Sequence, residues 1–217
     1  MNEIIAKTMK KLERNNMKAY YAENKGEVCG IVKKLIFDGA VITAGGSMSL
    51  KESGVWDIIE SPKYKFFDRT KPGITEEERL EAFKAAIGCD FFFCSSNAVT
   101  ENGELVNVDG TANRISSICF GPKNVVMVVG ANKIVKDINE GLLRIKRIAA
   151  PKNTERLKID APCRKLGHCV SLLKSDSPEM TDGCAGQTRI CCDYLVSAMQ
   201  RQKDRIKVII CGENLGY

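Results

Sequence analysis

The sequence predicts a layered α/β domain in which helices flank a mainly parallel sheet. Short apolar segments alternate along the chain with longer segments of helical periodicity, which is the pattern of such domains. The 217 residues can bury a substantial core, and 44% are hydrophobic against 28% charged, which excludes wholesale disorder. No apolar run approaches the ~20 residues that cross a bilayer. The first eleven residues lack the pattern of a signal peptide, and we therefore expect a cytoplasmic protein with no membrane attachment.

The first part of the chain is expected to contain helices and short strands in alternation. Residues 2–15 repeat apolar side chains at helical spacing and predict the first helix, and residues 17–21 predict a short strand. Residues 25–37 carry a second helical stripe that a glycine ends. The apolar run at 40–44 predicts a strand, and a further helix is expected through residue 59.

The clearest predicted helix begins at Thr75, where Glu78 three residues later completes a capping box. We expect this helix to end at Gly88 and to bury one apolar side, formed by Leu80, Phe83, Ala86 and Ile87. The segments around it predict short strands at 65–67, 90–95, 98–100 and 105–108. The Asn-Gly pair at 102–103 favours a tight turn, which would make the last two of these strands a hairpin.

The composition changes late in the chain. The last regular elements are expected to be a strand at 125–129, a helix at 135–148 that Pro151 closes, and a strand at 206–211. After about residue 161 the sequence becomes rich in Cys, Ser, Gly and Pro. We therefore divide the chain into an α/β domain at 1–160 and a cysteine-rich segment at 161–217, which returns a final strand to the sheet.

The first candidate site is the loop Gly45-Gly46-Ser47-Met48-Ser49, which follows a predicted strand and precedes a predicted helix. Glycines allow a tight turn there, and backbone amides and hydroxyls suit an anion such as phosphate or carboxylate. In open α/β sheets, ligands bind at this carboxyl end of the strands. The loop matches neither the P-loop nor the dinucleotide fingerprint, and an ordinary strand-to-helix turn with a serine cap remains open.

The second candidate site is a polar cluster around the predicted hairpin. Glu101 and Asn102 lie at the turn, and a carboxylate in that position can act as a nucleophile or general base if burial raises its reactivity. Asp109, Asn113 and Arg114 follow closely, and Arg114 could bind a carboxylate with two hydrogen bonds. Two ordinary turns explain the same local composition and are the simpler interpretation.

The ten cysteines predict two different roles. Four stand in apolar surroundings and are expected to be small buried hydrophobic residues: Cys29, Cys89, Cys94 and Cys119. Cys163, Cys169, Cys184 and Cys191 are crowded near the end, and four soft ligands can hold zinc or an iron–sulfur cluster. The usual CxxC knuckle is missing, so a redox pair, a disulfide or free thiols remain open. The sole histidine, His168, excludes a site with two histidines from one chain.

The net charge of +6 is concentrated in one stretch. Residues 144–174 hold nine basic side chains against Glu155 and Asp160, so this stretch alone is +7 (9 − 2) and the remainder is −1. Such a stretch can attract nucleic acid, an anionic substrate or an acidic partner. No aromatic residues are interleaved and no nucleic-acid-binding motif is present, so a solvated helix face and loop is the favoured interpretation, and nucleic-acid binding is not expected.

Several segments together resemble the lactate utilisation (LUD) domain family, also described as DUF162. They are AGGSMS at 44–49, CSSNAVTENGELV at 94–106, DGTANR at 109–114, the strand at 124–130 and VIICGENLGY at 208–217. The resemblance implies a fold like that of ribose-5-phosphate isomerase (RpiA), the NagB group and coenzyme A transferases. TENG at 100–103 is similar to the Ser-Glu-Asn-Gly motif of coenzyme A transferases, in which Glu is the nucleophile, and Glu101 would take that role.

The resemblance implies a role in the oxidation of L-lactate to pyruvate beside iron–sulfur partner subunits. Two functions therefore stand. The first is an accessory subunit that binds a small anionic ligand or nucleotide at residues 45–49 and contacts an iron–sulfur protein. The second is a coenzyme A or acyl transferase that uses Glu101. Whether the chain is an enzyme is left open between them, as is assembly into a homo-oligomer.

Overall fold

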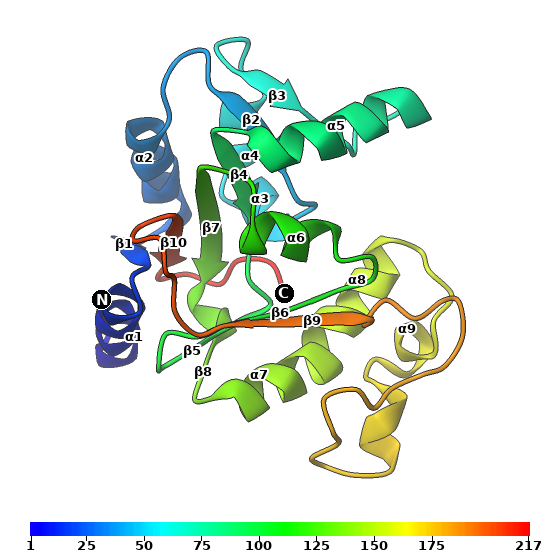
Figure 1. The fold of residues 1–217 in the computed structure, drawn as a ribbon. Coiled ribbons are helices and arrows are strands. Elements are labelled where there is room, and N and C mark those ends of the chain that lie inside the picture. The colour runs from blue at the N-terminus through cyan, green and yellow to red at the C-terminus, as the bar shows by residue number, and fades with distance from the viewer.

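The computed structural model describes residues 1–217 and contains two sheets (Figure 1). The main sheet is parallel throughout, in the order β1-β10-β7-β4-β2-β3. Its strands are β1 (Lys18–Ala22), β2 (Val41–Ala44), β3 (Lys65–Phe67), β4 (Phe91–Cys94), β7 (Asn124–Gly130) and β10 (Ile206–Cys211). The prediction of a layered α/β domain with a mainly parallel sheet is confirmed.

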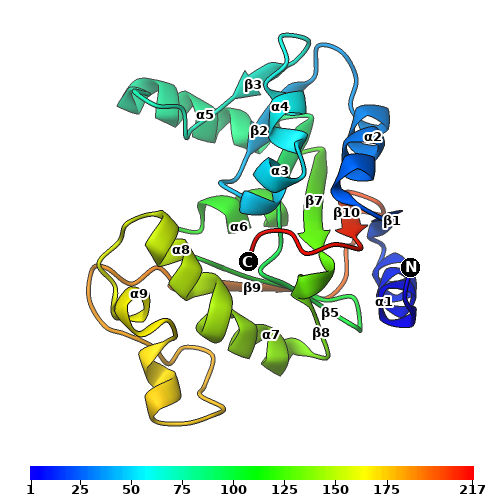
Figure 2. The ribbon, with the colours of Figure 1, turned by 180° about the vertical axis from the view of Figure 1, so that it is seen from behind.

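The second sheet is smaller and mixed, in the order β8-β5-β6-β9. Its strands are β5 (Ala98–Thr100), β6 (Leu105–Asp109), β8 (Ile134–Val135) and β9 (Asp193–Ser197). The hairpin expected at 98–108 is β5 and β6, which pair antiparallel. Figures 1 and 2 show this sheet crossing the end of the molecule toward which β7 points. Strand β9 was not predicted from the sequence. It pairs antiparallel with β6 and so adds a third strand to the hairpin.

Nine α-helices surround the sheets. They are α1 (Glu3–Arg14), α2 (Lys25–Leu35), α3 (Met48–Glu52), α4 (Val55–Ile59), α5 (Glu76–Gly88), α6 (Asn113–Cys119), α7 (Ile138–Arg144), α8 (Ala150–Arg156) and α9 (Pro162–Leu166). Short 3₁₀ turns lie at Ala131–Lys133 and Val170–Leu173, and a π-helical turn at Ile145–Ala149 joins α7 to α8.

Both faces of the main sheet are buried. One face carries alternate strand residues such as Phe91, Phe93 and Val126, and packs against α2, α3 and α4. The other face carries Phe92 and Met127 and packs against α1, α6 and the first strands of the second sheet. Parallel strands covered on both faces have few polar positions, which explains why the central strands read as continuous apolar runs. A third, small core lies between the second sheet and the α7–α8 region.

Several predicted details were wrong. The helix expected through residue 59 is two helices, because Gly54 takes a left-handed φ of 73° between them. Helix α5 buries Ala82 and Ala86, whereas Leu80 and Ile87 are exposed, since the helix rests on the sheet through its small residues. Among the cysteines expected to be buried, Cys119 is exposed at the end of α6 and Cys29 is half-buried, while Cys89 and Cys94 are buried.

Pro151 does not close the predicted helix. It lies at the junction between the π-helical turn at Ile145–Ala149 and α8, within the first two positions of α8. The π-helical turn before it carries the helical path from α7 into α8, so the chain remains helical to Arg156. This extension brings Arg156 to the cavity at the end of the main sheet.

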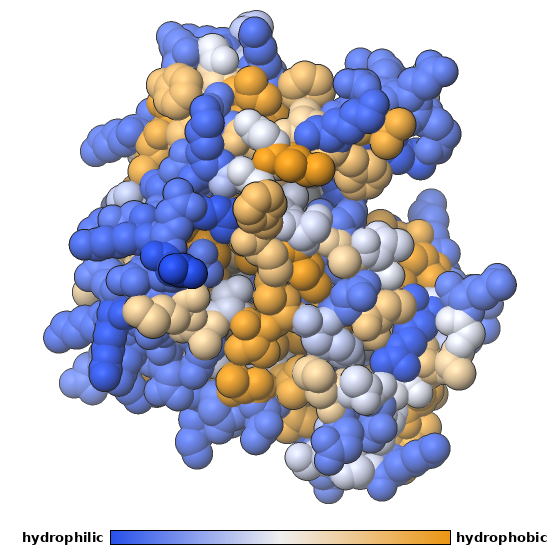
Figure 3. Space-filling view, viewed as in Figure 1, coloured by the Kyte–Doolittle hydropathy of each residue, from blue (hydrophilic) through white to orange (hydrophobic).

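The face seen in Figure 3 is mostly polar and carries an apolar band. The exposed large apolar side chains of the molecule include Phe120, which follows α6, and Val196 and Met199 around β9. None of the helices is long and apolar enough to span a membrane.

Candidate functional site

A cavity of about 350 Å³ lies at the carboxyl ends of the main-sheet strands. The strands β2 and β4 are neighbours in the sheet. The next main-sheet strand after β2 is β3, on one side of the pair, and the next one after β4 is β7, on the other side. Such a reversal of strand order leaves a crevice in which open α/β sheets bind ligands. The loops after β2, β3, β4 and β7 all contribute residues to the lining: Ser47, Arg69, Ser95 and Lys133.

The glycine loop after β2 forms one wall of the cavity. Gly46 and Ser47 line it, and the Ser47 hydroxyl accepts a hydrogen bond from the Leu50 amide as the cap of α3. The Gly45 amide donates to the Phe93 carbonyl at 2.8 Å, which ties the loop to β4. Ser49 is fully buried behind the wall, where its hydroxyl donates to the Leu215 carbonyl. The loop is therefore both a helix cap and a cavity wall.

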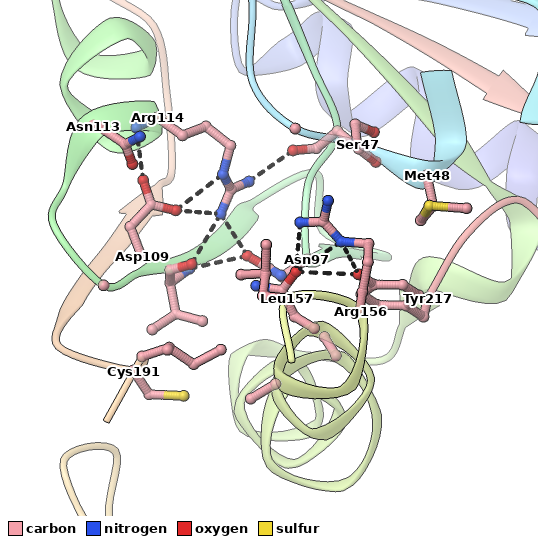
Figure 4. A pocket seen from close by; sticks show the side chains of 18 of the residues that line it. Ser47, Met48, Asn97, Asp109, Asn113, Arg114, Arg156, Leu157, Cys191 and Tyr217 are labelled. Carbon is pink, nitrogen blue, oxygen red and sulfur yellow. Dashed lines mark hydrogen bonds and ion pairs between the residues drawn. The ribbon is translucent and has the colours of Figure 1, made fainter. Parts of the chain in front are cut away.

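Arg114 organises the floor of the cavity (Figure 4). Its guanidinium forms an ion pair of 2.8 Å with Asp109, and donates to the side-chain oxygens of Asn97 and Asn107. It also donates to the carbonyls of Ser95 and Val108. Because every guanidinium nitrogen has a protein partner, Arg114 positions the loops rather than offering a free group to a ligand.

Asp109 is held by the start of α6. Its Oδ2 accepts hydrogen bonds from the backbone amides of Arg114 and Ile115, both at 2.8 Å. Asn113 lines the cavity beside this pair. The structure thus brings together Gly46, Ser47, Asp109, Asn113 and Arg114 from the two predicted clusters, although they lie more than sixty positions apart in sequence.

Two further arginines present less engaged groups to the cavity. Arg69 follows β3, and its only hydrogen bond is a long one, 3.4 Å from Nε to the Ala44 carbonyl. Burial lowers the pKa of Arg69, which marks a desolvated cation. Arg156 binds Asn153 and the Tyr217 hydroxyl through Nε and Nη2, which leaves its Nη1 unengaged.

Lys133 is the most deeply buried cation of the cavity, with only 3% of its surface exposed. Its ammonium group donates to the hydroxyls of Ser49 at 2.9 Å and Ser95 at 3.0 Å. Burial, followed by the charges of Arg144 and Arg114, lowers the pKa of Lys133 to about 7. A lysine that changes charge near neutral pH can accept a proton from a ligand or bind it as a cation.

Glu101 and Asn102 lie outside this cavity. They form the turn between β5 and β6, which packs against the end of α1. Glu101 makes a partly exposed ion pair of 2.7 Å with Lys7, and Asn15 donates to the carbonyls of Asn102 and Gly103. In this structure the turn ties α1 to the hairpin, and no reactive group of the cavity faces Glu101.

The four predicted cysteine ligands surround one second, small cavity. Cys163, Cys169, Cys184 and Cys191 all line it, although 28 positions separate the first from the last. No three of the His, Cys, Asp and Glu side chains are close enough together to hold a metal ion as they stand. Burial is the main cause that raises the pKa of Cys191 to about 12, so this thiol is protonated at neutral pH and would release its proton on binding a metal.

The family model of the LUD domain matches residues 5–211 of this chain. The chain belongs to the LUD domain family. Membership implies a role in lactate utilisation for this LUD protein. The match includes the loops at the end of the main sheet and the cysteine-rich segment.

Solved structures add support for the fold of this LUD domain. A DUF162 family protein from Deinococcus radiodurans aligns with a TM-score of 0.51 over 97% of each chain, at 14% identity. At that identity the likeness concerns the fold alone. A search of curated proteins returned no match.

Sequence reasoning missed several residues that line the cavity of this LUD domain. Arg69, Ser95 and Lys133 each follow a main-sheet strand, and the rule that ligands meet the carboxyl ends of strands could have singled them out. Arg156 and Tyr217 carried no such signal, because they reach the cavity only through the extended α8 helix and the packing of the C-terminal tail.

Proposed function

We propose that this LUD protein acts in lactate utilisation as an accessory subunit that binds a small organic anion in the cavity at the end of the main sheet. The observation that carries the proposal is the charge of the lining. Four basic side chains, Arg69, Arg114, Lys133 and Arg156, face one carboxylate, Asp109, and that carboxylate is already paired with Arg114. The remaining positive charge has no acidic partner in the lining and would attract an anion.

The ligand would be held by the groups that the protein itself leaves unengaged. The terminal nitrogens of Arg69 and the Nη1 of Arg156 can bind a carboxylate or a phosphate through charge-assisted hydrogen bonds. The cavity volume of about 350 Å³ falls within the range of small-molecule sites. A volume of that size would admit lactate or pyruvate with water, and would also admit part of a nucleotide.

The decisive experiment is a calorimetric titration with L-lactate, pyruvate and ATP as three separate probes. We expect at least one probe to bind, and Arg156→Ala to weaken its binding by about tenfold or more, because one charge-assisted hydrogen bond contributes about 1.5–3 kcal/mol. The matched control is Arg79→Ala, an exposed arginine on α5 outside the cavity lining. It should leave the affinity unchanged.

Two results would contradict the proposal of anion binding. One is the absence of measurable binding for all three probes. The other is equal loss of affinity in Arg156→Ala and Arg79→Ala, which would indicate a general charge effect rather than a site.

The accessory role predicts a physical association with an iron–sulfur protein. The LUD protein should co-elute with such a protein when both are purified from native cells grown on L-lactate, and mass spectrometry would identify the partner. Elution of the LUD chain without any iron–sulfur protein would contradict this part of the proposal and leave anion binding unaffected.

A further inference from the structure

Four thiols from four separate positions meet around the second cavity. Cys163 lies in α9, Cys169 precedes the 3₁₀ turn at 170–173, Cys184 lies in the following loop, and Cys191 precedes β9. The cavity itself has a volume of about 20 Å³, enough for about one water molecule. The other six cysteines of the chain lie outside this lining.

The loop that carries Cys184 is held around this cavity by two cations. Arg189 donates to the carbonyls of Cys191 at 2.8 Å, Cys184 at 3.1 Å and Thr181 at 2.7 Å. Lys146 donates to the Asp182 carbonyl, and its own carbonyl accepts from the Cys169 amide at 2.8 Å. Lys146 and Arg189 therefore place two positive charges beside the four thiols.

The arrangement of the thiols distinguishes between a single zinc ion and an iron–sulfur cluster as the bound metal centre. A single zinc ion needs its four sulfur ligands about 2.3 Å from one point, and no three candidate ligands converge in that way here. A four-iron cluster binds each cysteine at a different iron atom, so its ligands stand around a larger centre. Thiols distributed around a cavity match the second arrangement better than the first.

We infer that Cys163, Cys169, Cys184 and Cys191 bind a [4Fe–4S] cluster. Four thiolates on a cluster core of formal charge +2 give −2. The lining holds Lys146 and Arg189 against one carboxylate, Asp182, so its charge of +1 (2 − 1) partly offsets this value. The cavity must widen to admit the cluster. The chain between Leu173 and Asp193 has no helix or strand, so Cys184 and Cys191 can move outward without breaking a sheet. The movement would break hydrogen bonds that Arg189 and Lys146 donate to this loop.

The cluster would lie directly beside the anion cavity. Ala150, Ile190 and Cys191 line both cavities, so one residue forms a wall of the first and a ligand position of the second. Figure 4 shows Cys191 at the edge of the anion cavity, below Asp109. A redox centre in the LUD chain would then be separated from a bound anion only by the residues that line both cavities. The inference does not rest on anion binding, because metal content is measured without any ligand.

The test is metal analysis of the full chain, purified without oxygen and incubated with equal amounts of Fe²⁺ and Fe³⁺ and with sulfide, which together supply the oxidation states of a [4Fe–4S] core of charge +2. We expect about four iron and four sulfide per chain, the visible absorption of thiolate-bound iron, and a paramagnetic resonance signal on reduction. Cys191→Ser and Cys184→Ser should each lose most of the iron. Cys192→Ser is the matched control, because Cys192 is adjacent in sequence but exposed and outside the cavity lining, and it should keep the full iron content.

Three results would overturn the inference. Stoichiometric zinc without iron would indicate a mononuclear centre. Absence of any metal in folded protein, verified by circular dichroism, would leave the four cysteines as thiols. Equal iron content in Cys184→Ser, Cys191→Ser and Cys192→Ser would place the iron elsewhere. Because Cys184 is half-buried in a loop, its variant tests ligation even if replacement of Cys191 impairs folding.

Discussion

Lys133 is held in surroundings that disfavour its own charge. Its hydrogen-bond partners are the two neutral hydroxyls of Ser49 and Ser95, and the nearby guanidinium groups of Arg144 and Arg114 repel a proton. Glu52 and Cys94 act in the opposite direction, but more weakly. The side chain therefore loses its proton at a pH of about 7 in the folded protein, against an ordinary value of 10.5.

Because of this lowered pKa, Lys133 alone should make the free energy of unfolding depend on pH. Between about pH 7 and 10.5 the unfolded chain binds a proton at Lys133 that the folded chain lacks, so the free energy of unfolding should rise with pH. This contribution is complete above 10.5 and is lost as the pH falls toward 7. Relative to Lys133→Met, the wild type should gain about 1.4 kcal/mol per pH unit in the centre of this range, measured by urea unfolding.

The control for this measurement is Lys136→Met, which removes an exposed lysine three positions away. Its unfolding free energy should run parallel to that of the wild type across the whole pH range. A parallel curve for Lys133→Met as well would show that Lys133 titrates at its ordinary pH.

Residue roles were harder to predict than residue positions. The sequence placed Gly46, Ser47, Asp109, Asn113 and Arg114 in candidate sites, and all five line the cavity. Local composition could not reveal that Arg114 donates its hydrogen bonds to the protein itself. Two of its partners, Ser95 and Asn97, lie in the loop after β4, and they reach Arg114 only through the folding of the hairpin. Glu101 was proposed as a nucleophile because it lies in a family motif. Its surroundings are formed by α1, which is distant in sequence and packs against the turn, so the local sequence could not predict them.

At the scale of elements, the position of the C-terminal tail depends on its close contact with the end of β7 at Gly130. A Cβ atom on Gly130 would lie 2.2 Å from the Leu215 nitrogen. Asn132 holds the same tail, accepting from the Leu215 amide and donating to the Gly216 carbonyl. The tail in turn brings the Tyr217 hydroxyl to Arg156 at 2.8 Å, so a glycine in a strand determines the position of a cavity arginine.

Gly130→Ala should therefore displace the tail and destabilise the protein by about 1–3 kcal/mol, the usual cost of overpacking. It should also weaken anion binding several-fold, because Arg156 would lose its Tyr217 partner. Urea unfolding and calorimetry measure the two effects. Gly30→Ala is the control, since Gly30 lies inside α2 with open space around it and the change should stabilise the helix by about 0.5–1 kcal/mol. Unchanged stability in Gly130→Ala would show that the tail does not need this approach.

Most regular elements were predictable because their signals are local. The capping box of α5 is present as expected, with the Glu78 amide donating to Thr75 and the Thr75 amide donating to Glu78. The apolar strands of the main sheet follow their runs of hydrophobic residues. Strand β9 was missed because it follows the cysteine-rich loop and shows no alternation of buried and exposed residues. It becomes a strand by pairing with β6.

At the scale of the whole molecule, the late part of the chain completes sheets that the early part begins. Strand β10 lies between β1 and β7, and β9 forms the edge beside β6. We therefore expect the fragment 1–160 to lack a cooperative unfolding transition, because β1 has no sheet partner without β10. Circular dichroism during urea unfolding of the fragment and of the full chain measures this. A sigmoidal transition with native-like near-ultraviolet signals in the fragment would contradict it.

The central position of β10 also has a consequence for biosynthesis. Ribosomes add roughly 5–20 residues per second, so β1 emerges roughly ten to forty seconds before the strand that must join it to β7. During that interval the nascent chain exposes the apolar edges of its strands to other nascent chains. A chaperone that binds such edges until β10 is synthesised would raise the yield of folded protein. In the folded protein itself these edges are paired with β10.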